Sequence, residues 1–437
     1  MNSIKSENSF RKFMLLWSGE FVSAIGSGLT SFGLGVYVFQ QTGLASATAL
    51  VMLLAFLPNL LLSPLAGVLA DRYDRRLLMV AGDGLSALGL VFILVCMLRG
   101  EAQLWQICVG VTISSIFTSL LEPAYKATIT DLLTEEQFTK ASGLVQVAGS
   151  AKYLISPILA GYLLRISDIK LLIVIDICTL FLTIASTLVV RKGLASLRKE
   201  SENAFWNEFR EGWTALRQNQ GVLVLTVMAS VLTFFMGFIQ TLFTPMILAF
   251  ADSASLGAGT TISASGMLVT SLIIGLVPLK KGYAKILSAS LFLAGIFMAG
   301  FGLRENMIVI CTFGFLFFAM LPFANTCLDY LIRTNIENAI QGRVWGLIGI
   351  ISQFGYVIAY AISGVLADTV FRPLFVEGGA LAGNVGKIIG TGSGRGTGFL
   401  IIVAGGLLSL TAIGLSQIKS VRKLEERGKN VPENHLE

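Results

Sequence analysis

Apolar residues run through this chain in long stretches with few polar interruptions. The stretches are about 20 residues long, the length that an α-helix needs to cross a hydrocarbon core of ~30 Å. Because a backbone inside lipid must satisfy its own hydrogen bonds, such stretches predict helices. Twelve are found, at 13–39, 48–69, 77–98, 104–125, 141–164, 171–190, 221–250, 262–279, 286–303, 307–331, 344–366 and 398–418.

Composition agrees with this pattern. Of the 437 residues, 54% are hydrophobic and 13% are charged, whereas soluble domains carry about 25% charged residues. The first stretch is too long for a signal-peptide core and is expected to remain in the protein. We therefore predict an all-α integral membrane protein with twelve transmembrane helices.

The spacing of the stretches predicts two halves. Six precede a polar segment at 191–220 and six follow it, which gives six-helix halves at 1–190 and 221–437 joined by a linker. Part of the linker predicts an amphipathic helix in the inner headgroup layer, acting as a strap or as a regulatory segment. Its apolar face comprises Phe205, Phe209, Trp213 and Leu216.

An internal repeat supports two pseudo-symmetric halves. Under a shift of 203 residues, 143–163 aligns with 346–366 and six of 21 positions are identical, including two glycine pairs. Repeated halves around a central site are typical of secondary transporters. A chance match between two apolar segments is the alternative.

The basic residues predict the orientation in the membrane. With the N-terminus inside, 24 of the 32 Lys and Arg residues lie in inner segments and 7 in outer loops. This bias predicts a multi-pass protein of the cytoplasmic membrane with both termini cytoplasmic. The net charge of +6 then needs no nucleic-acid partner.

Several kinds of chemistry are not expected. The five cysteines all lie in apolar stretches and the single histidine, His435, lies in the polar tail, so neither metal sites nor a Ser-His-Asp triad are predicted. The glycine-rich segment 378–398 lacks the strand-and-helix context of a phosphate-binding loop. We expect a flexible or re-entrant outer loop there, no nucleotide, no cofactor and no enzyme activity.

Ionisable residues inside the stretches are candidates for function, because they are costly in lipid. They are Glu20, Asp83, Glu122, Lys152, Asp176 and Asp329. Glu20 is predicted to carry a proton or bind a cationic substrate, with a structural hydrogen bond as the alternative. Lys152 needs a partner, for which Glu20 and Glu122 are candidates, so these three form the predicted proton-coupling set. Asp83 and Asp176 are expected to be structural, Asp176 by snorkelling to the outer surface.

One motif resembles a known family. The segment "GVLADRYDRR" contains Gly67, Asp71, Arg72, Arg75 and Arg76 in the spacing of the major facilitator superfamily signature. Nearly the whole chain is similar to the macrolide-efflux-type drug exporters of that superfamily, which are drug:proton antiporters. The resemblance implies the major facilitator fold and a cytoplasmic latch. In that latch, Asp71 faces the amino end of the eleventh helix near residues 342–344. A topology signal alone is the alternative.

A second partial motif concerns the direction of transport. The superfamily's antiporters carry a glycine- and proline-rich pattern on the fifth helix. This sequence matches it at Gly143, Pro157 and Gly161 and has the small residues Ser156 and Ala160 at two further positions. Lys152 departs from the pattern. The resemblance implies export.

The repeat also suggests a gate. Under the shift of 203 residues, Lys126 aligns with Asp329. Each has an oppositely charged residue four positions away in its own helix, Glu122 for Lys126 and Arg333 for Asp329. We expect the two charges to meet when the cytoplasmic side closes. Two independent intrahelical pairs are the alternative.

These features together predict a secondary active transporter that exports amphipathic small molecules in exchange for protons by alternating access. The expected partners are the substrate, protons and the lipid bilayer. There are two alternatives. The protein could export one metabolite, such as a siderophore or lipid, or it could be a non-transporting sensor. The substrate cavity is predicted to be lined by aromatic residues that ordinary core packing also explains: Phe234, Phe235, Phe238, Phe315 and Phe318.

Overall fold

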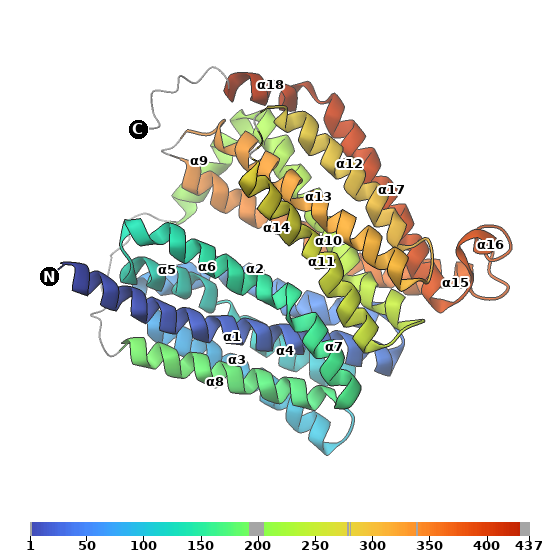
Figure 1. Ribbon diagram of the computed structural model, residues 1–437, viewed down its shortest axis with the longest axis horizontal. Helices are drawn as coiled ribbons and strands as arrows, with labels where there is room; N and C mark the ends of the chain where they lie inside the picture. Colours follow the sequence, from blue (N-terminus) through green and yellow to red (C-terminus); the bar gives the residue numbers. More distant parts are fainter. Residues whose placement is uncertain (1, 192–204, 278, 280, 338–339, 429–437) are drawn as a thin grey trace. The chain divides into compact units, whose positions relative to one another are not determined.

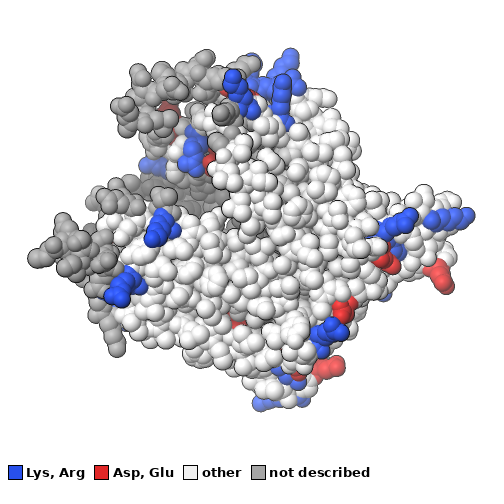
Figure 2. Space-filling model, in the orientation of Figure 1, with Lys and Arg blue, Asp and Glu red and all other residues white. Residues whose placement is uncertain are grey.

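The computed structural model describes residues 2–191, 205–277, 279, 281–337 and 340–428. Every regular element within these ranges is a helix. Twelve helical segments are long and apolar enough to cross a membrane, which agrees with the twelve apolar stretches. Figure 2 shows broad flanks without charged side chains, with the visible basic and acidic groups gathered toward helix ends.

The chain forms two compact units. The first comprises Met1–Glu202 together with Asp252–Thr261, and the second comprises Asn203–Ala251 and Ile262–Glu437. The short segment belongs with the first unit because it packs there, and the Thr261 hydroxyl donates to the Leu154 carbonyl at 2.9 Å.

Proline breaks two spans of the first unit. Its helices are α1 (Asn2–Thr42), α2 (Ala45–Arg72), α3 (Arg75–Arg99), α4 (Leu104–Thr118), α5 (Leu121–Leu132), α6 (Glu135–Leu154), α7 (Ser156–Ile166) and α8 (Ile169–Arg191). A proline lacks the N–H donor and its ring clashes with the carbonyl four residues earlier. Pro123 and Pro157 each lie in the first turn after a break, so the fourth span divides into α4 and α5 and the fifth into α6 and α7.

Small residues set the packing of α1 along α8, which lie side by side in Figure 1. Glycines recur every seventh residue on α1, and the residues of α8 that they approach lie progressively earlier in the chain, so the helices are antiparallel. The pairs are Gly19 with Ser186, Gly26 with Thr179, and Gly33 with Leu172. Because α1 and α8 pack closely along this line, the face of α8 that carries Asp176, Thr179 and Thr183 is buried inside the unit.

Glycine also brings helices together in the second unit. Its main helices are α9 (Phe205–Gln218), α10 (Gln220–Leu248), α11 (Ser253–Leu276), α12 (Tyr283–Phe301), α13 (Met307–Arg333), α14 (Gln341–Leu366), α17 (Ser393–Gln417) and α18 (Lys419–Gly428). Gly295 of α12 and Gly405 of α17 face each other. A Cβ on either would lie 2.5 Å from the other's carbonyl oxygen.

The segment between α14 and α17 contains three short elements. They are η1 (Ala367–Phe371), α15 (Arg372–Phe375) and α16 (Gly386–Ile389), of which α15 and α16 are labelled in Figure 1. Gly378 lies between α15 and α16, and Gly390 and Gly392 lie between α16 and α17. All three adopt positive φ angles, where a side chain would be strained. The expected outer loop is thus a series of turns and short helices.

Two amphipathic helices pack against the membrane-spanning helices of the second unit. In α9, Leu216 of the predicted apolar face is buried, Arg343 of α14 pairs with Glu211, and Phe205 and Phe209 have side chains outside the described set. The helix α18 was not expected from the sequence. Its residues Val421 and Leu424 are buried, and Leu424 lies against Gly221 of α10.

Candidate functional site

The motif between α2 and α3 forms a turn whose polar groups are mostly paired. Asp74 caps α3, since its Oδ1 accepts from the Arg76 backbone N–H at 3.1 Å, and its Oδ2 accepts from Arg191 Nε at 2.9 Å. Arg76 is buried, whereas Arg72 is exposed. No described residue lies within 4 Å of a Cβ built on Gly67.

Arg75 is the centre of this turn. Its guanidinium lies 2.7 Å from Asp131 of α5, donates to the carbonyls of Ala127 at 3.1 Å and Ala70 at 3.2 Å, and lies 3.6 Å from Asp71. It therefore ties α2, α3 and α5 together. The sequence motif did not indicate Asp131 as a partner. The Asp71 side chain remains 54% exposed.

Three acids lie in the interior of the first unit. Glu20 comes from α1, Asp83 from α3 and Asp176 from α8, and each has a buried oxygen with no hydrogen-bond partner among the described residues. Asp83 and Asp176 are both buried, so the expectation that Asp176 snorkels outward is wrong. It is wrong because Asp176 points toward α1, next to Gly26, where the missing side chain leaves room.

The structure does not place Lys152 in an ion pair with either expected partner. Glu122 pairs with Lys126 at 2.6 Å. Lys152 is half-buried on α6, and its charge acts on Asp176. The sequence does contain a signal for the polar surroundings of Asp176. Asp176, Thr179, Thr183 and Thr187 follow one another at intervals of three or four and so mark one polar face of α8.

The antiporter-like motif lies at the break between α6 and α7. The Ser156 hydroxyl donates to the Ile25 carbonyl of α1 at 3.0 Å. Gly161 approaches the start of α11 so closely that a Cβ there would lie 2.5 Å from the Ser253 carbonyl oxygen, and Gly257 lies against the Pro157 carbonyl. Gly143 has no neighbour of this kind within 4 Å among the described residues.

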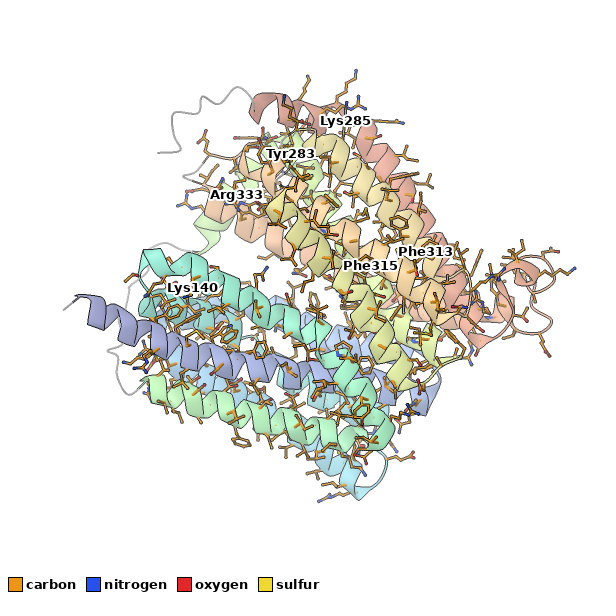
Figure 3. All side chains as sticks on the ribbon, viewed as in Figure 1. Lys140, Tyr283, Lys285, Phe313, Phe315 and Arg333 are labelled. Carbon is orange, nitrogen blue, oxygen red and sulfur yellow. The ribbon has the colours of Figure 1, made fainter. Side chains whose placement is uncertain are left out.

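The charges assigned to the gate form their intrahelical pairs. Besides the pair of Glu122 with Lys126, Arg333 lies 3.1 Å from Asp329. These side chains are all at least half exposed. Arg333, labelled in Figure 3, also lies over the ring of Trp345 at 5.9 Å. The pairing of Lys126 with Asp329 stays a prediction.

The predicted aromatic residues divide by burial. Phe235 and Phe238 of α10 are buried in the second unit, where Phe234 contacts both, with ring centroids 5.2 and 4.8 Å apart. Phe315 and Phe318 on α13 are half-buried, and Phe315 is labelled in Figure 3. Phe234, Phe315 and Phe318 are thus the members with accessible surface.

The chain is similar to several known proteins. Residues 16–360 match the Major Facilitator Superfamily. Macrolide efflux protein A of Streptococcus pyogenes is 30% identical over 378 residues, covering 84% of this chain and 92% of that protein. The protein of the same name from Enterococcus faecalis is 31% identical over 324 residues, covering 72% and 99%.

A solved structure shares the fold. A bacterial homologue of the human lysosomal transporter Spinster aligns with a TM-score of 0.72 at 13% identity, covering 97% of this chain and 99% of that one. The expected fold is thereby confirmed. Together, the matched family profile, the twelve spans and the shared fold establish that the chain belongs to the major facilitator superfamily and is a multi-pass membrane transporter rather than an enzyme.

Proposed function

We propose that this transporter exports amphipathic small molecules, macrolides among them, in exchange for protons. The observation that carries the proposal is the 30% identity to macrolide efflux protein A over 84% of the chain. Two features of the structure support it. Accessible aromatic rings on α10 and α13 suit apolar substrates, and Glu20 on α1, which has one buried carboxyl oxygen, suits proton binding.

The direct test is transport by the purified protein in proteoliposomes with an imposed pH gradient. We expect uphill movement of a macrolide, and of other amphipathic cations, that stops when a protonophore collapses the gradient. Transport at the same rate with and without the pH gradient would contradict proton exchange. Transport of one polar metabolite alone would replace the proposed substrate class.

Glu20→Gln tests the acid on α1 in the same assay. An amide cannot carry a proton at neutral pH, so this variant is expected to lose uphill transport while still binding substrate. Glu101→Gln is a matched control, because Glu101 is exposed at the other end of the unit. Unchanged pH dependence in Glu20→Gln would show that Glu20 is not the proton carrier.

A further inference from the structure

The first unit holds more titratable groups in its interior than the coupling role of Glu20 requires. Asp83 is 1% exposed and Asp176 is 3% exposed, and each has an unpartnered buried oxygen in the described structure, as Glu20 does. No ion pair within the described residues includes any of the three. A buried carboxylate without a partner is strongly disfavoured.

Two buried hydroxyls face the same acids. Tyr125 of α5 is 9% exposed and Thr30 of α1 is 4% exposed, and the Tyr125 hydroxyl has no hydrogen-bond partner in the described part of the chain. Tyr125 interacts electrostatically with Glu20, and Thr30 faces Asp176. Unpartnered polar groups gathered in one interior region indicate bound water or exchangeable protons.

The acids lie along the axis of the unit rather than around one point. A Cβ built on Gly84 would lie 3.9 Å from the Ile184 side chain, so the neighbouring residue Asp83 is at about the level of Ile184 on α8. Asp176 lies eight residues from Ile184, which is about 12 Å along the helix. The hydroxyls of Thr179 and Thr183 lie between them and are buried. Within the described residues no group of three acids, cysteines or histidines is close enough to hold a metal ion.

The surrounding charges do not neutralise the three acids. Glu20 and Asp176 both act on Asp83, and Lys152 acts on Asp176. On neighbouring elements, Glu122 and Lys126 pair with each other, Asp131 pairs with Arg75, and Arg191 pairs with Asp74. Lys152 therefore acts on one of these carboxyl groups, and acids that act on one another cannot all be ionised in an apolar interior.

We propose that Asp83 and Asp176 bind protons and, with Glu20, form an acid lane through the first unit. Each carboxyl oxygen takes a proton from water and returns it to water, with bridging water molecules between the groups. No bond other than O–H forms or breaks, and no redox partner is needed. The role of the lane in coupling rests on the proposed proton exchange, but its proton binding does not.

Infrared difference spectra of the purified full-length protein test the lane directly. In mildly acidic buffer, above the ordinary pKa of about 4 for exposed carboxyls, the wild-type protein should show carboxylic C=O bands that shift in D2O and disappear in alkaline buffer. Asp83→Asn and Asp176→Asn should each lose one band, and Asp83→Glu should restore it. Asp168→Asn is the matched control, because the Asp168 side chain is 57% exposed, and it should keep all bands. Spectra of the two Asn variants that equal the wild-type spectrum would overturn the proposal.

A second measurement needs no variant. A hydrophobic carbodiimide converts protonated buried carboxyls to N-acylureas, so peptide mass spectrometry should find Asp83 and Asp176 modified in acid and protected in alkali. Asp131, held by Arg75, should stay unmodified. If an Asn variant does not fold, absence of modification at both acids in the wild type overturns the proposal.

The two proposals fail in different ways. If the bands and modifications appear but transport ignores the pH gradient, the acid lane stands and proton exchange is wrong. If transport follows the gradient while neither acid shows a band or a modification, proton exchange stands and the acid lane is wrong.

Discussion

At the residue scale, Arg75 gives its two acidic neighbours different roles. Asp131 lies 2.7 Å away and is mostly shielded, with 20% of its side chain exposed, so this pair contributes to stability. Asp71 lies 3.6 Å away and is 54% exposed. A pair with this exposure contributes little to folding, which leaves the Asp71 carboxylate available to another partner during transport.

These roles predict opposite phenotypes. Asp71→Asn should abolish transport while leaving expression, thermal unfolding and substrate binding close to wild type. Asp131→Asn should instead lower the free energy of unfolding by about 1 kcal/mol, because it weakens a charged hydrogen bond. Proteoliposome transport and thermal unfolding in detergent measure the two effects. Wild-type turnover in Asp71→Asn would contradict the latch.

Asp252 offers a test of pH dependence outside the membrane. It precedes α11, and its carboxylate accepts from the Ser255 backbone N–H at 2.9 Å. Hydrogen bonds from the Ser255 side chain and backbone lower the pKa of Asp252 below its usual value. A lowered folded-state pKa stabilises the fold above the unfolded-state pKa, and this contribution is lost as pH falls through the folded-state pKa.

We therefore expect Asp252→Ala to cost about 0.5 kcal/mol at neutral pH, the low end for an N-cap, because the site is exposed. The difference from wild type should shrink as the pH falls below about 4, the ordinary pKa of Asp, and should vanish below the lowered folded-state pKa. Thermal unfolding across that range measures it. A difference that stays constant to low pH would show that the charged cap is not the cause.

At the scale of elements, α18 is joined to α12 through one acid. Glu425 accepts from the backbone N–H groups of Gly282 at 2.7 Å and Ala284 at 3.3 Å. These donors belong to the amino end of α12, where the helix has no side-chain cap of its own. A carboxylate at a helix amino end is favoured by both the free amides and the dipole.

Glu425→Ala should therefore lower the free energy of unfolding by about 1 kcal/mol. Lys423→Ala on the exposed face of the same helix should change it little and serves as the control. Thermal unfolding in detergent, followed by hydrogen exchange at the amino end of α12, compares the two. Equal destabilisation by both would show that the helix, rather than the capping contact, matters.

At the scale of the whole molecule, the charge bias predicts sidedness. Residues of α18 should lie in the cytoplasm and those between α15 and α16 outside. In a background with the five cysteines replaced by serine, Glu377→Cys should react with an impermeant maleimide in intact cells. Lys423→Cys should react only after permeabilisation. The reverse pattern would invert the predicted orientation.

The sequence by itself determined the number of spans and the family of the protein. This was possible because lipid requires each crossing segment to be long, apolar and helical, whatever its neighbours are. The breaks at Pro123 and Pro157 were not determined in this way, because α2 runs unbroken through Pro58 and Pro64.

Only the tertiary structure decided which polar groups meet. Asp176 on α8 lies inside the unit because Gly26 on α1 leaves room for it, and Asp131 holds Arg75 although 56 residues separate them. Glu425 reaches α12 across 143 residues. Such contacts depend on how helices rotate and approach, which the spacing of residues within one helix does not specify. The candidate residues and their partners within one helix, such as Glu122 for Lys126, were therefore visible in the sequence. Their partners on other helices were not.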